Sequence, residues 1–237
     1  MRGQSVVTSW HDYPGAILGT TEQSLVRWFQ TNVGVGETWL DVGAHYGYTA
    51  IALSRLVGPE GRVFAFEPVK STVASLARTR AANGLEQLTV VPIALGDQPQ
   101  QSTLRVPSIR GMADSTLVSG EDWETISAIS LDAYWAKLSG SLPQIHGVKI
   151  DVQGMELLVL RGMRRLLTKW VPKLIIEFHR GVDRGSVIDL LASAGYSTSY
   201  KGIDGETSEL ADDCSYLFEP EPSECVSLST RSITARN

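Results

Sequence analysis

TWLDVGAHYGYTAIALSRLVGPEGRVFAFE, residues 38–67, is the stretch that decides the fold of this chain. It opens with a short apolar run that is typical of a strand buried on both faces of a parallel sheet. Gly43 and Gly47 then bound a turn, after which apolar residues recur at the spacing of one helical face. A Gly-Pro-Glu-Gly break ends that helix, and a second apolar strand follows. The pattern predicts a strand–helix–strand unit with an acid at each strand end, Asp41 and Glu67.

This unit predicts a site for an adenosine-containing cofactor beyond the carboxyl ends of the strands. Glu67 is placed to accept hydrogen bonds from two ribose hydroxyls, a role that nicotinamide cofactors and S-adenosylmethionine share. A dinucleotide site favours G-x-G-x-x-G, whereas His45 stands at the position of the middle glycine. Asp41 directs a negative charge at the turn, which suits the cationic amino-acid end of S-adenosylmethionine. The alternative for Asp41 is a carboxylate that only caps the turn.

Composition and charge describe an ordinary globular protein. The chain has 237 residues, 43% of them hydrophobic and 20% charged, with a net charge of −5. This length suits one large domain, and the acidic balance argues against a broad nucleic-acid interface. No apolar run suggests a signal peptide or a membrane span, and Cys214 and Cys225 form no metal-binding pattern. We therefore expect a cytoplasmic protein with free thiols, without nucleic-acid or membrane partners.

Three regions are expected along the chain. Residues 1–37 form an aromatic leader and a helix that covers the sheet, 38–218 form the cofactor-binding domain, and 219–237 form a flexible tail. The leader is a candidate lid over the cofactor and a candidate dimer contact.

The sequence predicts a third strand over residues 88–95. Its end places the backbone of Ala94 and Leu95, together with Asp97, near the adenine of the cofactor, although Asp97 also suits a plain turn. The polar segment 98–125 that follows is expected to supply substrate contacts or a small hairpin.

Candidate catalytic residues follow two later strands. Residues 146–152 read as a strand whose end carries Asp151, a helix is expected over 155–170, and residues 173–179 form the next strand. Since side chains alternate along a strand, Glu177 and His179 point to the same face, at the edge where Asp151 ends its own strand.

His179 is the candidate general base of this group, because its ordinary pKa lies near neutrality. Asp151 is expected to bind the methionine ammonium or to steer the acceptor, and Glu177 to shape the site. Two alternatives stay open. His179 could be a structural imidazole bonded to a carboxylate, and the three side chains could hold Mg²⁺, although no spacing signature supports a metal site.

Five blocks in this order resemble the FkbM-type family of S-adenosylmethionine-dependent methyltransferases. They are DVGAHYGYTAIALSRLVGPEGRVFAFEP, NGLEQLTVVPIALGD, ISLDAY, VKIDVQGMELLVLRG and LIIEFH. The resemblance implies an α/β, doubly wound, Rossmann-like fold of the class I methyltransferase type. Its sheet is seven-stranded and mostly parallel, with helices on both faces and an antiparallel last strand.

The resemblance also implies which residues bind the cofactor. These are Asp41, Gly43, Ala44, His45, Gly47, Glu67, Pro68 and Asp97, joined in our reading by Ala94, Leu95 and Asp151. The family commonly has Asn where this chain has His45, and both residues tolerate unusual backbone angles. It usually has Glu where this chain has Gln153, so no mechanism should need a carboxylate there.

The function that the resemblance implies is S-adenosylmethionine-dependent O-methylation of a small hydroxylated acceptor, sugar-containing or a secondary metabolite. One alternative is an NAD-dependent oxidoreductase or epimerase, which the missing G-x-G-x-x-G and Tyr-x-x-x-Lys patterns disfavour. Another is a non-catalytic cofactor-binding protein that stabilises a partner enzyme.

Overall fold

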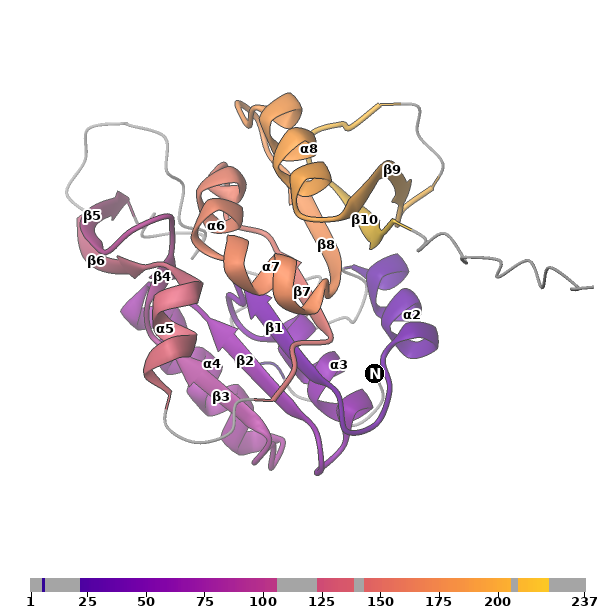
Figure 1. The fold of residues 1–237 in the computed structure, drawn as a ribbon. Coiled ribbons are helices and arrows are strands. Elements are labelled where there is room, and N and C mark those ends of the chain that lie inside the picture. Colours follow the sequence, from indigo (N-terminus) through magenta and orange to yellow (C-terminus); the bar gives the residue numbers. More distant parts are fainter. Residues whose placement is uncertain (1–5, 7–21, 106–122, 139–142, 206–208, 222–237) are drawn as a thin grey trace, which may run out of the picture.

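The computed structural model describes residues 6, 22–105, 123–138, 143–205 and 209–221. Its large sheet has seven strands in the order β3-β2-β1-β7-β8-β10-β9 (Figure 1). All neighbouring pairs are parallel except those of β10, which runs antiparallel to β8 and β9. The strands are β1 (Thr38–Val42), β2 (Arg62–Phe66), β3 (Leu88–Val91), β7 (Gly147–Ile150), β8 (Lys173–Phe178), β9 (Tyr196–Gly202) and β10 (Cys214–Pro220).

Helices cover both faces of this sheet, because alternate strand residues face opposite ways. Trp39, on one face, packs in a core with residues of α2, α3 and α4. Leu40, on the other face, belongs to a second core with residues of α5, α6, α7 and α8. The predicted doubly wound sheet is confirmed. The helices are α2 (Gln23–Asn32), α3 (Tyr48–Val57), α4 (Lys70–Ala82), α5 (Leu131–Lys137), α6 (Glu156–Gly162), α7 (Arg164–Trp170) and α8 (Arg184–Ser193).

A second, three-stranded sheet stands beside the first, in the order β4-β6-β5 (Figure 1). Its strands are β4 (Ala94–Leu95), β5 (Gln100–Arg105) and β6 (Trp123–Ile129). The prediction of one strand over residues 88–95 was therefore wrong. Pro92 has no N–H to donate, and the Ile93 N–H donates to the Val91 carbonyl instead of a sheet partner, so the chain leaves the large sheet there. The antiparallel β5–β6 pair agrees with the expected hairpin.

The helix predicted over residues 155–170 is two helices, α6 and α7. A Cβ added at Gly162 would lie 1.8 Å from the backbone oxygen of Gly96, so the chain needs glycine there. The new helix begins two residues later, where the Asp132 carboxylate accepts from the backbone N–H groups of Arg165 (3.0 Å) and Leu166 (3.1 Å). This cap satisfies orphan donors at the start of α7 and fixes the break.

The two ends of the chain are described only in part. Helix α2 covers part of one face of the sheet as expected, burying Leu25 and Phe29 in the core that contains Trp39. Strand β10 continues to Pro220, two residues beyond the predicted boundary at 218. The expected lid and the tail from residue 222 onward lie outside the described residues, so the region boundaries stay a prediction. Within the described part of the chain, no helix is both long and apolar enough to cross a bilayer.

Candidate active site

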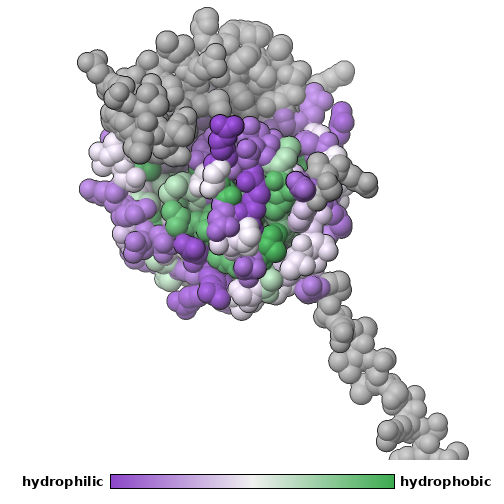
Figure 2. Space-filling model, turned by 90° about the horizontal axis from the view of Figure 1, so that it is seen from above, coloured by the Kyte–Doolittle hydropathy of each residue, from purple (hydrophilic) through white to green (hydrophobic). Residues whose placement is uncertain are grey.

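A cavity of about 600 Å³ opens beyond the carboxyl ends of β1, β2 and β7. Most of its lining comes from four segments: the end of β1 with the turn into α3, residues 66–68 at the end of β2, the small sheet with Ile93 before it, and residues 149–155 at the end of β7. Glu22 and Glu177 also line it. This is the edge where open α/β sheets bind ligands, and the volume lies within the range of small-molecule sites. Seen from above, the described part of the surface carries hydrophobic residues near its centre with hydrophilic residues around them (Figure 2).

The turn after β1 forms one wall of the cavity, and its backbone conformation requires glycine. Gly43 has φ +83°, and a Cβ there would lie 1.7 Å from the backbone oxygen of Asp151. Gly47 has φ +90° and precedes the first residue of α3. His45 has φ +50°, so it adopts the unusual backbone angle that the sequence required of this position. Gly43 and Ala44 line the cavity through this turn, whereas Gly47 supports it from behind, against Leu76.

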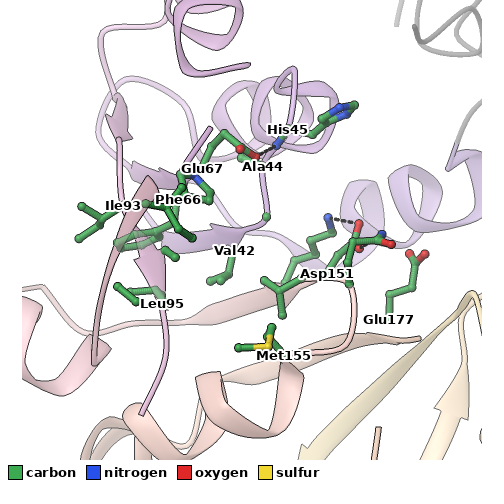
Figure 3. A pocket seen from close by; sticks show the side chains of 18 of the residues that line it. Val42, Ala44, His45, Phe66, Glu67, Ile93, Leu95, Asp151, Met155 and Glu177 are labelled. Carbon is green, nitrogen blue, oxygen red and sulfur yellow. Dashed lines mark hydrogen bonds and ion pairs between the residues drawn. The ribbon is translucent and has the colours of Figure 1, made fainter. Parts of the chain in front are cut away.

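Glu67 holds the turn in place from the end of β2. Its Oε2 accepts from the backbone N–H of His45 at 3.0 Å (Figure 3), and its Oε1 accepts from that of Val69, also at 3.0 Å. Burial raises the pKa of Glu67 to about 7, although both hydrogen bonds favour the ionised form. An ionised carboxylate offers about four acceptor positions, so each oxygen retains capacity for a ligand hydroxyl.

One end of the cavity is apolar. Asp151 and Glu177 lie at the other end (Figure 3). The side chains at the apolar end are those of Val42, Phe66, Ile93, Leu95 and Met155. Such a lining suits a flat aromatic base.

Residues near this apolar end include three that the sequence assigned to the cofactor. Ala94 and Leu95 line the cavity as expected, and so does Pro68. Asp97 does not: it is exposed, after Gly96 on the turn between β4 and β5, and is absent from the lining. The structure therefore favours the turn-residue alternative for Asp97.

Asp41 also lies elsewhere than expected. It is fully buried, outside the cavity lining, and its Oδ2 accepts from Thr49 Oγ1 at 2.6 Å. Its Oδ1 lies 3.7 Å from Lys149 Nζ, because the two residues are register partners in β1 and β7. The charge of Asp41 thus faces an internal lysine and not the turn.

Sequence reasoning overlooked Lys149. The signal was visible, because a charged residue stands between Val148 and Ile150 in an otherwise apolar strand.

Lys149 also contacts Asp151, and it lines the cavity with it. Its Nζ lies 3.0 Å from Asp151 Oδ2. Burial disfavours the charged form of Lys149, but Asp151 and Asp41 outweigh burial and hold the lysine pKa well above its usual value. Burial likewise opposes ionisation of Asp151, yet Lys149 lowers the pKa of that carboxyl. Two carboxylates around one ammonium leave this end of the cavity net negative, which suits a ligand ammonium group.

Asp151, Glu177 and His179 come together as the sequence predicted. His179 Nε2 lies 3.5 Å from Asp151 Oδ1 and 3.6 Å from Glu177 Oε1. Asp151 and Glu177 line the cavity, whereas His179 is 7% exposed and stands behind them. One donor atom from each of the three lies within 4.8 Å of the others. The alternative that Mg²⁺ occupies this cluster is untested by the structure.

The surroundings of Glu177 and His179 raise the pKa values of both residues. Burial, followed by the nearby charge of Asp151, raises the pKa of Glu177 to about 7. Burial acts to lower the pKa of His179, but the hydrogen bond to Glu156 and the charge of Asp151 outweigh it and raise that pKa. The imidazole therefore holds a proton more firmly than an isolated histidine does.

Glu156 is a site residue that the sequence analysis missed. It begins α6, is fully buried, and its Oε1 lies 2.8 Å from His179 Nδ1. The same oxygen accepts from the backbone N–H of Gly154 at 3.1 Å. The signal was an acid five residues after Asp151, at the start of a helix.

The strand order, the antiparallel last strand and the cavity beyond β1 and β2 define a Rossmann-like fold of the class I methyltransferase type. Two solved structures of this fold illustrate the match. An FkbM methyltransferase from Methylobacillus flagellatus KT superposes with a TM-score of 0.53 and 19% identity, over 90% of this chain and 56% of that one. Fibrillarin from Aeropyrum pernix, solved with natively bound S-adenosyl-L-methionine, gives 0.51 and 14%, over 92% of this chain and 85% of that one.

Sequence comparison assigns the family. Residues 41–198 match the Methyltransferase FkbM domain. The hexuronic acid methyltransferase AglP of Haloferax volcanii is 34% identical over 179 residues, which cover 75% of this chain and 70% of that protein. The chain therefore belongs to the FkbM methyltransferase family, as the five blocks indicated.

Proposed function

We propose that this protein is an S-adenosylmethionine-dependent O-methyltransferase whose acceptor is a hydroxyl group of a sugar-containing molecule. The observation that carries the proposal is the polarity of one cavity. It has an apolar end beside Glu67 and an acidic end where Asp151 and Glu177 stand before His179. The two ends suit the two halves of one reaction, a cofactor held by its nucleoside and an acceptor oxygen that must lose a proton.

The chain's own residues fit the cofactor. Glu67 retains acceptor positions for ribose hydroxyls, and the apolar end beside it suits adenine. The net negative charge around Lys149 suits the ammonium of the methionine part. Bound S-adenosylmethionine supplies a methyl group on a cationic sulfur, which makes that carbon an electrophile. We therefore assign Glu67 and Asp151 to opposite ends of the bound cofactor.

His179 takes the acceptor proton in this proposal. The acceptor hydroxyl would lose its proton to Nε2 as its oxygen bonds the methyl group that the cofactor, held by Glu67 and Asp151, would supply, with the electron pair of the carbon–sulfur bond staying on sulfur. General base catalysis of this kind contributes typically 10²–10⁴-fold. Asp151 and Glu177 lie beside Nε2 and stabilise the imidazolium that results.

The choice of a sugar hydroxyl rests on the relative and on charge. AglP is by its name a hexuronic acid methyltransferase. A hexuronic acid offers hydroxyls and a carboxylate, and either could accept a methyl group. Two carboxylates at the acidic end disfavour a third beside them, whereas a hydroxyl can donate to one of them. This favours an ether product over an ester.

Cofactor binding is tested first, by thermal melts of the full chain with S-adenosylmethionine, S-adenosylhomocysteine or NAD. A ligand that binds only the folded state, at 100 times its dissociation constant, stabilises it by about 2.7 kcal/mol. We expect both adenosyl compounds to raise the melting temperature and NAD to leave it unchanged. A shift with NAD alone would support the oxidoreductase alternative.

Transfer is tested next with methyl glucuronide, which presents both kinds of oxygen, and methyl glucoside, which presents hydroxyls alone. We expect a methylated product that survives mild alkali, as an ether does, and loss of turnover by about 10²-fold or more in His179→Ala with nearly unchanged cofactor affinity. An alkali-labile product would replace the hydroxyl with a carboxylate acceptor. Adenosyl binding with no transfer, together with a heteromeric complex on size exclusion, would favour the non-catalytic alternative.

A further inference from the structure

A buried carboxylate lies directly behind the imidazole that the proposed reaction uses. Glu156 is 0% exposed, and its Oε1 is 2.8 Å from His179 Nδ1. The two residues belong to different elements, since Glu156 begins α6 whereas His179 follows β8. The contact therefore fixes the ring relative to the sheet edge and to the helix at once.

This contact selects one tautomer of the neutral ring. A carboxylate can only accept, so Nδ1 must carry the hydrogen and Nε2 is left with a lone pair. The other side of the ring agrees: the side-chain nitrogen of Gln153 lies 2.9 Å from Nε2, where an amide N–H donates to that lone pair. Both neighbours thus favour a ring whose basic nitrogen is Nε2, where the hydroxyl of a bound acceptor would replace the Gln153 N–H as donor.

Nε2 is also the nitrogen that faces the acidic end of the cavity. Asp151 Oδ1 is 3.5 Å from it and Glu177 Oε1 is 3.6 Å, whereas the exposed Asp213 reaches 3.9 Å from the loop before β10. Lys149 compensates part of this charge through Asp151. Of the four carboxylates around the ring, Glu156 alone approaches Nδ1 within the described residues, and the others approach Nε2.

We propose that Glu156 is the positioning residue of His179, holding the imidazole as its Nδ1–H tautomer so that Nε2 is the proton acceptor at the methyl-transfer site. The role of Nε2 in methyl transfer rests on the function proposed above. The assignment of the tautomer rests only on the contacts of the ring. Glu156 touches neither acceptor nor cofactor in this arrangement. It acts through the ring, by orienting it and by stabilising the imidazolium once Nε2 has taken a proton.

The tautomer can be measured without any acceptor. Long-range ¹H–¹⁵N spectra of the ¹⁵N-labelled full chain distinguish the protonated ring nitrogen, and His179→Ala identifies the signals among the four histidines. His146 supplies an internal reference, because its Nδ1 accepts from the backbone N–H of Thr38 at 3.0 Å, so its hydrogen must be on Nε2. At a pH high enough for both rings to be neutral, we expect opposite tautomers for His179 and His146. An Nε2–H tautomer for His179 in the wild-type protein would overturn the proposal, whatever the protein methylates.

Variants separate positioning from structural support. Glu156→Gln keeps the size of the side chain but removes the charge, and its amide can present either an oxygen or an N–H to Nδ1, so the pKa of His179 should fall and the Nδ1–H form should lose its dominance. Asp213→Asn is the matched control, since it removes a carboxylate on the Nε2 side and should leave the tautomer unchanged. If Glu156→Gln does not fold, Glu156→Asp keeps the charge with a shorter reach and should mix the two tautomers. Variants that fold with an unaltered ring would refute the proposal.

Kinetics supply the second readout, with the acceptor found by the transfer assay. Removing the carboxylate behind a metal-binding histidine typically costs 10–100-fold, and by analogy we expect Glu156→Gln to lower kcat by that order with cofactor affinity retained. The acidic limb of the rate profile should move to lower pH, because a carboxylate that raised the His179 pKa is gone. In a His179→Ala background the same substitution should cost little more. Full additivity of the two losses would contradict action through the ring.

Discussion

Asp41 and Lys149 are register partners in neighbouring parallel strands, and their charged atoms lie 3.7 Å apart in the interior. Because Lys149 also bonds the partly exposed Asp151, its removal would leave one buried and one partly buried carboxylate uncompensated. Breaking a buried ion pair in this way costs about 3–5 kcal/mol. We expect Lys149→Met to lower the free energy of unfolding by that order in chemical denaturation. Lys201→Met, which removes an exposed partner of Glu219, should cost less than about 1 kcal/mol.

Adding Asp41→Asn to Lys149→Met tests whether the lost stability comes from the uncompensated charge of Asp41. In the double variant Asp41→Asn/Lys149→Met one of the orphaned charges is gone, so part of the lost stability should return. A double variant no more stable than Lys149→Met alone would show that Asp41 is neutral in the native protein.

Gly43 tests how closely the cofactor turn approaches Asp151. In Gly43→Ala, the strain of a positive φ, about 1–2 kcal/mol, adds to a clash with a backbone oxygen 1.7 Å away. Gly36→Ala is the matched control, because its φ is also +83° but a Cβ there meets nothing within 4 Å. We expect Gly36→Ala to show the strain alone, and Gly43→Ala to lose clearly more stability and its adenosyl binding. Equal melting temperatures for the two variants would mean that the turn relaxes freely.

Glu67 should make cofactor affinity depend on pH. Its carboxyl has a pKa of about 7 and must be ionised to accept from two ribose hydroxyls without giving up its bonds to His45 and Val69. Since only the ionised fraction is competent, the dissociation constant of S-adenosylhomocysteine should be about tenfold higher at pH 6 than at pH 8. Calorimetric titration across this range measures the change.

The carboxyl of Glu177 titrates in the same range, with a pKa of about 7, and so provides the control. Glu67→Gln should weaken binding and flatten the pH dependence, whereas Glu177→Gln should retain the dependence. If Glu177→Gln flattens it instead, the acidic end of the cavity governs binding and Glu67 does not.

Chelation distinguishes a general base from a bound metal ion at the cluster of Asp151, Glu177 and His179. With Nδ1 bound to Glu156, the imidazole already provides a proton acceptor. A general base of this kind needs no metal ion. We therefore expect methyl transfer to persist after treatment with EDTA and dialysis, at a rate within about twofold of the untreated rate. Activity that is lost on chelation and restored by Mg²⁺ or Mn²⁺ would instead show a cation held by these three side chains.

Much of the site followed from local pattern. The turn between Gly43 and Gly47, the acid at Glu67 and the meeting of Asp151 with His179 depend on strand and helix periods and on the rule that parallel strands end at one edge. Each of these features is encoded within a few residues. The prediction failed where a local signal was ambiguous: Asp97 suits a turn as well as a pocket, and Pro92 interrupts an otherwise continuous apolar run.

The sequence by itself thus determined the doubly wound sheet, the place of the cavity and the family. Only the tertiary structure decided that Asp41 faces Lys149 and that Glu156 stands behind His179. Register sets the first pair, since a shift by one residue would send either side chain to the opposite face. The docking of α6 against the sheet sets the second. Both contacts join residues far apart in the chain, and packing fixes such distances where local periodicity does not.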